Sequence, residues 1–371
     1  MSGPEEDGPR VAAEEADRRF MARALELAGA GWGRVHPNPV VGAVVVRDGV
    51  VVGEGAHREY GGPHAEVEAL GQAGDRARGA TLYVTLEPCA HHGKTPPCTD
   101  AILDHGIARV VYAVADPHPE AGGGAARLAK AGVSVETGVE AERARAGNAT
   151  FLVPIEGQRP FVAVKFGLSV DGRIAARAGE RTRVTGRESE REVHRLRAGF
   201  DAILVGARTA RIDDPSLTVR HGPSPRVPPV RVVADPGARL PLDGELARTA
   251  REVPVVALVA ESAPQERVAA LEGMGVEVER VPGTGAGLAL HTALDRLWER
   301  GVRTVFCEGG GRLVASLLAD DRVDRLYLFE APVLFGTEGV PAFPGPAGFR
   351  GGRVEVRAMG EDTLITIDRR S

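Results

Sequence analysis

Cysteine is scarce in this chain, whose 371 residues include only Cys89, Cys98 and Cys307. An odd number of cysteines in a long chain argues against a framework of disulfide bonds. The chain also lacks any run of about 18 apolar residues, which a membrane-spanning helix would need. Its first segment, Met1–Asp17, is acidic, whereas a signal peptide has a basic region followed by an apolar one. We therefore expect a cytoplasmic protein with no membrane partner.

Positive charge is not in excess either. The 46 Lys and Arg residues are outnumbered by 51 Asp and Glu residues, which gives a net charge of −5. This balance disfavours binding to a nucleic-acid backbone, so no nucleic-acid partner is expected. A chain of this length with 43% hydrophobic residues exceeds what one core usually holds, and two globular domains are expected.

The chain is expected to form two α/β domains joined by a short connector. Residues 1–13 are rich in Gly, Pro and Glu and are expected to be disordered, with the first helix starting near Glu14. The first domain is placed at residues 14–153 and the second at residues 160–371, because helices and strands alternate in both. Pro154–Pro160 is the expected connector.

A hairpin and an alternation of helices and strands are predicted. Val40–Val46 and Val50–Gly53 flank Asp48-Gly49, a pair that favours the tight turn of a β-hairpin. The other expected strands are Thr81–Leu86, Arg109–Ala115, Val133–Thr137, Phe161–Phe166, Ala202–Val205, Val230–Ala234, Val253–Val259, Thr304–Cys307 and Leu326–Glu330. The expected helices are His64–Gln72, Cys98–His105, Ala125–Lys130, Ala141–Asn148, Ser189–Arg197, Pro264–Met274, Ala289–Arg300 and Gly311–Leu318.

The clearest chemical signal is one histidine and two cysteines, His64, Cys89 and Cys98, with Glu66 two positions after the histidine. One imidazole and two thiolates form a zinc set that leaves a fourth position for water, whereas a structural site normally has four protein ligands. Glu66, near the metal but not bound to it, can carry a proton from that water to a leaving amine. The pattern predicts one zinc ion per chain, with Glu66 as the catalytic residue of a hydrolytic deaminase.

These residues also have a structural interpretation, in which the histidine belongs to a helix and the cysteines to a core. The three residues occur in the order H-x-E, then P-C, then a second cysteine at a helix start. This combined order disfavours a purely structural role for the three residues taken together. His91 and His92, between the cysteines, could serve as ligands instead. Adjacent histidines in a Gly- and Pro-rich loop are more often solvated or substrate-facing, so both are left out of the metal set.

The segments His64–Glu66 (H-A-E) and Glu87–Cys98 (E-P-C-x-H-x-G-x-T-P-P-C) resemble the deaminase half of the bifunctional riboflavin-biosynthesis deaminase and reductase family. Pro37–Gly42 is similar to the P-N-P-x-V-G segment of that family. The resemblance implies a cytidine-deaminase-like three-layer fold for the first domain. It also implies contacts with the pyrimidine or its ribose phosphate by Asn38, His57, Lys94 and Asp116.

Each of these contacts has a structural alternative. Asn38 could be a turn residue, His57 a surface group at a strand end and Lys94 a solvated lysine. One departure affects the substrate site: the family typically has D-P-N-P where this chain has Asp116-Pro117-His118-Pro119. The hydrogen bond of that asparagine must be made by His118 or lost, and His118 is not included in the expected site.

The second half lacks a G-x-G-x-x-G fingerprint after a strand, but Glu308-Gly309-Gly310-Gly311 follows the expected strand Thr304–Cys307. Backbone amides at such a helix start can approach a pyrophosphate closely. A tight strand-to-helix turn would explain the same glycines equally well.

Further segments are similar to the reductase half of the same family: Pro160–Lys165, Ser169–Ala175, Arg197-Ala198, Asp201–Gly206 and Asp213–Thr218 with Arg220. The resemblance implies a dihydrofolate-reductase-like fold and NADPH as the hydride source. The implied cofactor-binding residues are Leu168, Arg183, Thr209, Asp213, Gly310, Gly311, Arg312, Leu313, Val314, Ala315 and Ser316. The implied substrate-binding residues are Lys165, Arg197, Leu217, Arg220 and Glu308.

Three basic residues in these sets carry specific expectations. Arg197 and Arg220 would offer bidentate forks to the substrate phosphate, and Lys165 would be an electrostatic or proton-donating partner of Glu308. As alternatives, Lys165 could be a strand-edge lysine and Arg197 an exposed helix arginine. Arg183 stands where the family usually has the tryptophan of W-I-T, so packing beside the cofactor is expected to differ here.

The sequence therefore predicts an enzyme with two active sites. By the resemblance, it would deaminate 2,5-diamino-6-ribosylamino-4(3H)-pyrimidinone 5′-phosphate and then reduce the ribosyl chain to ribityl with NADPH. The sequence alone does not fix the oligomeric state, but the resemblance implies a homodimer formed through the reductase domain. The alternatives are a nucleic-acid-editing zinc deaminase with an accessory domain, which the net charge disfavours, and a zinc-stabilised binding module, which the presence of Glu66 disfavours.

Overall fold

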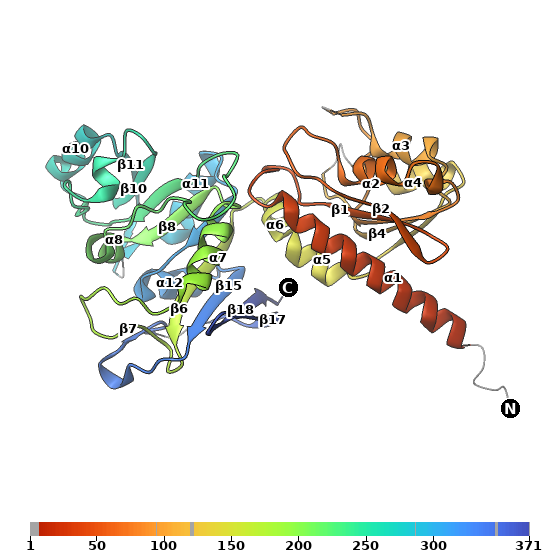
Figure 1. Ribbon diagram of the computed structural model, residues 1–371. Coiled ribbons are helices and arrows are strands. Elements are labelled where there is room, and N and C mark those ends of the chain that lie inside the picture. Colours follow the sequence, from red (N-terminus) through yellow and green to blue (C-terminus); the bar gives the residue numbers. More distant parts are fainter. Residues whose placement is uncertain (1–6, 94, 119–121, 286, 346–347, 371) are drawn as a thin grey trace. The chain divides into compact units, whose positions relative to one another are not determined.

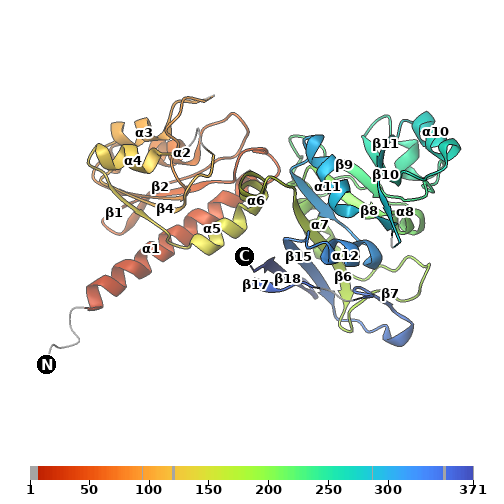
Figure 2. The same cartoon turned by 180° about the vertical axis from the view of Figure 1, so that it is seen from behind.

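The computed structural model describes residues 7–93, 95–118, 122–285, 287–345 and 348–370, and the chain divides into two compact units, Met1–Glu156 and Gly157–Ser371 (Figures 1 and 2). The division falls within the segment expected to be a connector. No helix in the described ranges combines the length and the apolar character needed to cross a membrane.

The first unit is a three-layer α/β fold. Its described residues form a five-stranded sheet in the order β2-β1-β3-β4-β5, with β1 antiparallel to both neighbours and β3, β4 and β5 parallel. The helices α1 and α5 lie on one face, and α2, α3 and α4 on the other (Figure 1). The strands are β1 Gly42–Arg47, β2 Val50–Ala56, β3 Thr81–Leu86, β4 Arg109–Val114 and β5 Ser134–Thr137. The helices are α1 Asp7–Ala28, α2 Ala65–Ala73, α3 Cys98–Asp104, α4 Gly124–Lys130, α5 Ala141–Gly147 and α6 Ala149–Gly157.

The predicted hairpin is confirmed. Asp48 and Gly49 both have positive φ values, 52° and 76°, as a two-residue turn of type I′ requires. The turn joins β1 to β2, whose register pairs Arg47 with Val50.

Two expectations for the first unit are wrong. Helix α1 begins at Asp7 rather than near Glu14, so residues 7–13 are helical, while residues 1–6 lie outside the described part. Pro9 falls in the first turn, where a missing N–H costs no intrahelical hydrogen bond. Helix α6 runs through Pro154, which was placed in the connector. Its Leu152 is buried in the core, and this burial outweighs the helix-breaking tendency of Pro154.

The second unit is built on a nine-stranded sheet, counted over its described residues, in the order β11-β10-β9-β8-β14-β6-β15-β18-β17. All neighbours pair in parallel except β15 with β18 and β18 with β17. Its strands are β6 Phe161–Ser169, β8 Ala202–Gly206, β9 Val230–Ala234, β10 Val255–Ala260, β11 Glu277–Val281, β14 Thr304–Cys307, β15 Arg325–Ala331, β17 Gly351–Met359 and β18 Asp362–Arg369. Two short pairs, β7 Arg173–Ala175 with β16 Val340–Pro341 and β12 Gly283–Thr284 with β13 Gly287–Leu288, complete the strands.

Helices cover both faces of this sheet. Alternate residues of β8 enter two apolar cores, Ala202 and Leu204 one of them and Ile203 and Val205 the other, as the two-residue period of a strand requires. Residues of α11 and α12 belong to the first core, and residues of α8, α9 and α10 to the second. The helices are α7 Arg187–Arg197, α8 Ala207–Asp213, α9 Glu245–Arg248, α10 Gln265–Met274, α11 Leu290–Glu299 and α12 Gly311–Ala319.

The antiparallel end of the sheet was not predicted. Strands β17 and β18 form a hairpin whose outer strand alternates charged residues with Val354 and Val356, which are 57% and 62% exposed. An edge strand that buries few apolar residues has a weak hydrophobic signal in the sequence, even where charged and apolar residues alternate regularly. The strand was missed for this reason.

Two glycines of β2 let α2 approach the sheet closely. A side-chain carbon at Gly55 would overlap the carbonyl oxygen of Ala65 at the start of α2. A side-chain carbon at Gly53 would overlap the carbonyl oxygen of Ala69 in the same helix. Neither glycine has a positive φ, so the requirement is for space rather than for an unusual backbone conformation.

We expect Gly55→Ala to destabilise the first unit by about 1–3 kcal/mol, because α2 must move away from β2. Gly71→Ala is the matched control, since Gly71 lies on the exposed side of α2 with no atom within 4 Å of an added Cβ. It should stabilise the helix by about 0.5–1 kcal/mol. Calorimetric unfolding of the full chain measures both effects, and equal effects of the two substitutions would contradict the close packing.

Candidate active sites

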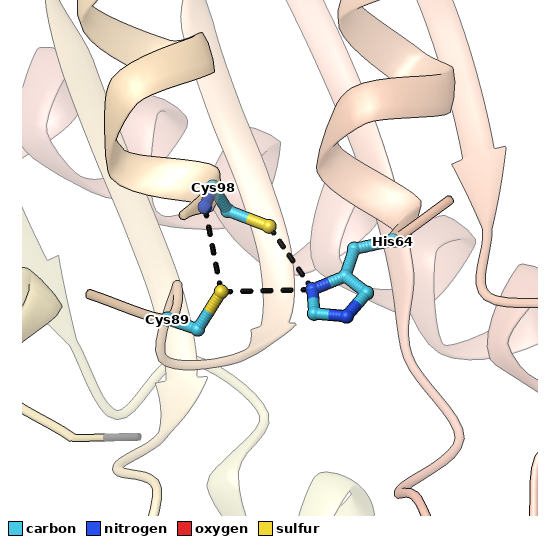
Figure 3. Close-up of side chains that lie close together, drawn as sticks. All are labelled: His64, Cys89 and Cys98. Atoms are coloured by element: carbon cyan, nitrogen blue, oxygen red, sulfur yellow. Dashed lines mark hydrogen bonds between the residues drawn. The ribbon is translucent and has the colours of Figure 1, made fainter. Parts of the chain in front are cut away.

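The three predicted zinc ligands converge in the first unit. His64 precedes the first turn of α2, Cys89 follows β3 by three residues, and Cys98 is the first residue of α3. The distances from His64 Nδ1 are 3.2 Å to Cys98 Sγ and 3.6 Å to Cys89 Sγ (Figure 3). One ligand atom from each residue lies within 4.8 Å of the others.

This donor set fits zinc. Tetrahedral bonds of about 2.3 Å to sulfur and 2.0 Å to nitrogen place neighbouring ligand atoms about 3.5 Å apart, close to the observed separations. The other ring nitrogen, His64 Nε2, lies 3.5 Å from Thr95 Oγ1, so a proton on Nε2 leaves the lone pair of Nδ1 for a metal. Hydrogen bonding from the Cys98 thiol and from His64 outweighs burial and lowers the pKa of Cys89 to about 4, which favours a thiolate.

Glu66 lies in the first turn of α2 and is only 4% exposed. Burial raises the pKa of its carboxyl group, which favours its taking up a proton. Glu66 and His64 line one cavity of about 280 Å³ together with Cys89. A buried carboxyl group therefore lines the same cavity as two of the three predicted ligands, His64 and Cys89.

The expected pyrimidine contacts are found around this cavity, which Asn38, His57 and Asp116 line, while Lys94 lies outside the described residues. His57 Nδ1 donates to the carbonyl oxygen of Pro63 at 2.9 Å, so His57 Nε2 accepts from Asn38 Nδ2 at 3.2 Å. Burial lowers the pKa of His57, which keeps its ring neutral. This contact uses Asn38 Nδ2 and leaves Oδ1 of the same amide as a hydrogen-bond acceptor.

Several lining residues were missed or set aside. His91 lines the cavity, and so does His118, whose backbone N–H donates to Asp116 Oδ1 at 2.9 Å. Glu87 Oε1 accepts from the backbone N–H groups of Gly123 and Ala125 and so fixes the neighbouring loop. Neither histidine belongs to the site expected from the sequence. Tyr60, Thr95 and Phe151 also line the cavity, and no local sequence motif indicates such a role for them.

Among the described residues of the second unit lie a cavity of about 480 Å³ and a larger one of about 820 Å³. They adjoin, because Ile174, Thr182, Thr209, Asp213 and Gly310 line both. A cofactor in one and a substrate in the other would therefore meet along this shared wall.

Most of the expected cofactor residues line the smaller cavity: Thr209, Asp213, Gly310, Gly311, Arg312, Leu313 and Ser316. Gly309 and Gly310 have φ values of 115° and 91°, which residues with a side chain rarely adopt. A side-chain carbon at Gly311 would lie 2.8 Å from the carbonyl oxygen of Ala342. The glycines at the start of α12 are therefore required by the backbone itself.

Four expected cofactor residues do not line the smaller cavity. Leu168 and Val314 are buried in the apolar core of the second unit, because the sides of β6 and α12 on which they lie face that core. Ala315 lines neither of the two cavities. Arg183 lines the larger cavity instead, and its guanidinium forms an ion pair with Glu190 at 2.9 Å.

All five expected substrate residues line the larger cavity, namely Lys165, Arg197, Leu217, Arg220 and Glu308. The fork of Arg197 is already engaged, because Arg197 Nε and Nη2 bind Glu308 and Nη1 donates to the carbonyl oxygen of Thr218 at 2.8 Å. This differs from the expectation that Arg197 holds a phosphate in its fork. The sequence around Arg197 does not indicate that its partner is Glu308, which lies 111 positions further along the chain.

The electrostatics of this cavity centre on Glu308. Burial opposes its charge, but Arg197 and Lys165 hold the pKa of its carboxyl group below its ordinary value. Burial lowers the pKa of Lys165, although Glu308 acts in the opposite direction. A carboxylate and a lysine whose pKa is lowered by burial therefore line the same cavity.

Two family models match the chain: the cytidine and deoxycytidylate deaminase zinc-binding region over residues 14–114, and the RibD C-terminal domain over residues 160–365. The riboflavin biosynthesis protein RibD of Aquifex aeolicus is 41% identical over 363 residues, which cover 96% of this chain and 99% of the relative. The protein of the same name from Escherichia coli is 38% identical over 343 residues, covering 89% and 92%.

Solved structures agree with this result. Acinetobacter baumannii RibD, form 1, has a TM-score of 0.77 and 33% identity, with 96% of this chain and 100% of that chain covered. A diaminohydroxyphosphoribosylaminopyrimidine deaminase/5-amino-6-(5-phosphoribosylamino)uracil reductase from Thermotoga maritima has a TM-score of 0.76 and 34% identity, covering 96% and 99%. The chain therefore belongs to the RibD family of bifunctional deaminase and reductase enzymes of riboflavin biosynthesis.

Proposed function

We propose that the first unit deaminates 2,5-diamino-6-ribosylamino-4(3H)-pyrimidinone 5′-phosphate and that the second unit reduces the ribosyl chain of the product to ribityl with NADPH. The observation that carries the first step is the buried carboxyl group of Glu66 in the cavity that His64 and Cys89 line, next to the cluster of His64, Cys89 and Cys98. The pair of adjoining cavities in the second unit supports the second step.

Zinc would be held by His64, Cys89 and Cys98, and when bound it supplies a Lewis acid that makes a water nucleophilic near neutral pH. Deamination replaces the C–NH₂ group of the pyrimidine by a carbonyl group and releases ammonia. Glu66 takes a proton from the attacking water and passes it to the departing nitrogen, a role that its raised pKa favours. Asn38 Oδ1 would accept a hydrogen bond from the pyrimidine, because His57 holds the other end of the Asn38 amide.

NADPH would lie in the smaller cavity, with its pyrophosphate against the backbone at Gly310 and Gly311. When bound it supplies the hydride, and the ribosyl chain must also gain a proton. The lowered pKa of Lys165 makes its ammonium group the better proton donor, and Glu308 keeps that charge in place. Arg220 offers the guanidinium fork that Arg197 does not.

The proposed enzyme acts in the cytoplasm as a homodimer. We place the enzyme in the cytoplasm, because all three cysteines are free and two of them are needed as thiolates. We also propose a homodimer formed through the reductase domain, for which the exposed Val354 and Val356 of the edge strand β17 offer an apolar surface. A nucleic-acid-editing deaminase has no support beyond the shared zinc motif, given the net charge of −5.

The metal assignment predicts that Cys98→Ser loses most of the zinc, because a hydroxyl group is a much poorer ligand than a thiolate. Cys307→Ser is the matched control, since Cys307 is buried in the core of the second unit and is not a member of the ligand cluster. Elemental analysis should find about one zinc per chain in the native protein and in Cys307→Ser. Full zinc occupancy in Cys98→Ser would refute the ligand set.

Glu66→Gln should lower the rate of ammonia release by two to four powers of ten, because the amide cannot take up the proton. Zinc content should stay unchanged, since Glu66 is not a ligand. Glu68→Gln, two residues along α2 and outside the cavity lining, keeps an acceptor for the N–H of Ala56 and should leave deamination near the native rate. Reduction of the purified deaminated compound should be normal in both variants, and its loss in Glu66→Gln would mean that the two steps share one site.

Glu308→Gln should impair reduction and spare ammonia release. The neutral amide removes the partner of Arg197 and one of the charges near Lys165, and breaking a buried pair in this way costs roughly 3–5 kcal/mol of stability. Each half-reaction is started from its own purified substrate, with NADPH consumption and ammonia measured separately. Normal reduction by a folded Glu308→Gln protein would remove Glu308 from the reductase site.

A further inference from the structure

One buried side chain in the larger cavity has no role in the reaction proposed above. His194 lies on α7 three residues before Arg197, and it is 2% exposed. It lines the cavity with Arg197, Arg220 and Glu308. Residues three apart on a helix share a face, so His194 and Arg197 point into the same space.

The hydrogen bonds of His194 define which ring nitrogen can donate. The backbone N–H of Arg220 donates to His194 Nδ1 at 3.2 Å, so in a neutral ring the proton is on Nε2. The ring also packs edge-on against His221, with centroids 5.2 Å apart. Within the described ranges no hydrogen-bond partner of Nε2 is found, and Nε2 is not among the fully enclosed atoms that lack one. Nε2–H is therefore an unused donor at the cavity wall.

The surroundings of His194 favour an anion. Burial and the positive charges of Arg197 and Arg220 lower the pKa of His194 to about 4, against the opposing effect of Glu308. The ring is thus neutral at pH 7 and donates only through Nε2. The charge of Arg197 is balanced by Glu308, whereas the exposed guanidinium of Arg220 contacts Ser216 Oγ and has no carboxylate partner among the described ion pairs.

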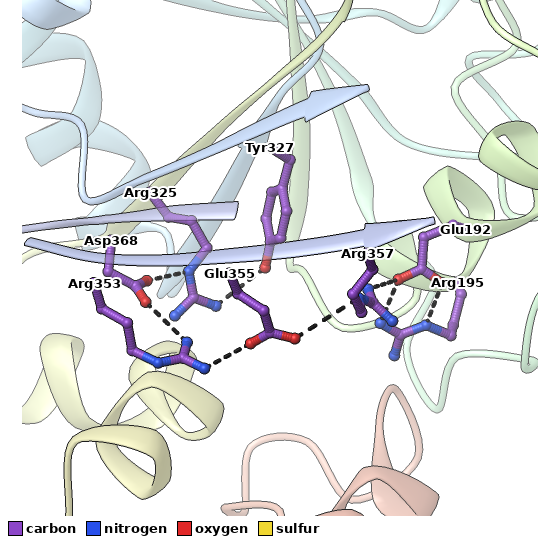
Figure 4. Close-up of polar contacts among 8 residues, drawn as sticks. All are labelled: Glu192, Arg195, Arg325, Tyr327, Arg353, Glu355, Arg357 and Asp368. Atoms are coloured by element: carbon purple, nitrogen blue, oxygen red, sulfur yellow. Dashed lines mark hydrogen bonds and ion pairs between the residues drawn. The ribbon is translucent and has the colours of Figure 1, made fainter. Parts of the chain in front are cut away.

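The position of α7 is fixed from its other side. Glu192 accepts from Arg195 Nε at 2.7 Å on the same helix and from Arg357 Nη2 of β17 at 2.8 Å. Figure 4 shows these ion pairs continuing along the β17–β18 hairpin through Arg353, Glu355 and Asp368 to Arg325. A helix held in this way presents His194 at a defined place, which a directional hydrogen bond requires.

We propose that His194 Nε2–H and the Arg220 guanidinium form the subsite for the 5′-phosphate of the reductase substrate, with His194 donating to one phosphate oxygen. This inference rests on the proposed reductase function and adds a specificity-determining residue to it. A phosphate suits the subsite better than a pyrimidine ring, because both groups are donors and one is a cation. A pyrimidine edge would need an acceptor as well.

Two substitutions separate the two ring nitrogens. His194→Asn places an amide oxygen near the position of Nδ1, which keeps an acceptor for the Arg220 N–H but removes the donor at Nε2. His194→Gln places an amide nitrogen near Nε2 and keeps the donor. The measurement is kcat/KM of the full chain for the phosphorylated substrate and for the same compound without its phosphate. Inorganic phosphate, tested as a competitive inhibitor, gives a second readout.

For His194→Asn, we expect the preference for the phosphorylated substrate to fall by about tenfold to a hundredfold, the range for one hydrogen bond to a charged group. Inhibition by inorganic phosphate should weaken by a similar factor. His194→Gln should keep both within about threefold of the native values. The KM for NADPH and the rate of ammonia release should be unchanged in both variants, which shows that the fold is intact.

Three outcomes would overturn the inference. An equal loss for both substrates in His194→Asn would make His194 a structural residue or a contact to the pyrimidine. Unchanged kinetics would remove it from the site. If the native chain reduced neither substrate with NADPH, the proposed reductase function itself would fail, and this result is distinct from the other two because it needs no variant.

Discussion

Both candidate sites depend on the direction in which parallel strands end. In the first unit Cys89 follows β3, and Asp116 follows the parallel neighbour β4. In the second unit Glu308 directly follows β14, which lies between β6 and β8. Because parallel strands end at the same sheet edge, side chains distant in sequence meet there. Helix starts at the same edge add partial positive charge, which suits thiolates in one unit and a pyrophosphate in the other.

The sequence predicted best what is encoded locally. The cluster of His64, Cys89 and Cys98 was recognisable because zinc prefers imidazole and thiolate donors, and the hairpin was recognisable because Asp48-Gly49 suits one type of turn. Partners across the fold were not recognisable. Arg197 was expected to hold a phosphate but binds Glu308, and His194 was overlooked because a single helical histidine has no distinctive pattern. Tertiary packing stabilises the β17–β18 hairpin and the helix that runs through Pro154. Such packing overrides the local conformational preference of the sequence, so neither element was predicted.

Two arginines of the larger cavity in the second unit, Arg197 and Arg220, differ in whether a carboxylate balances their charge. The wall shared by the two cavities includes Thr209, Asp213 and Gly310, so molecules bound in the two cavities would meet there. Glu308 neutralises Arg197 next to this wall, while Arg220 keeps an exposed cation on the loop after α8. Of these two arginines, Arg220 is therefore the one whose charge would attract an anionic group. Such a division orients a substrate that carries its charge at one end.

The rarity of lysine gives the reductase cavity a distinctive chemical reactivity. The chain has only three lysines, Lys94, Lys130 and Lys165, among its 46 basic residues, and guanidinium groups do not react with acylating reagents near neutral pH. Burial lowers the pKa of Lys165, so a larger share of this side chain is the nucleophilic free amine. An amine-directed covalent probe small enough to enter the 820 Å³ cavity would thus have very few competing targets on this protein.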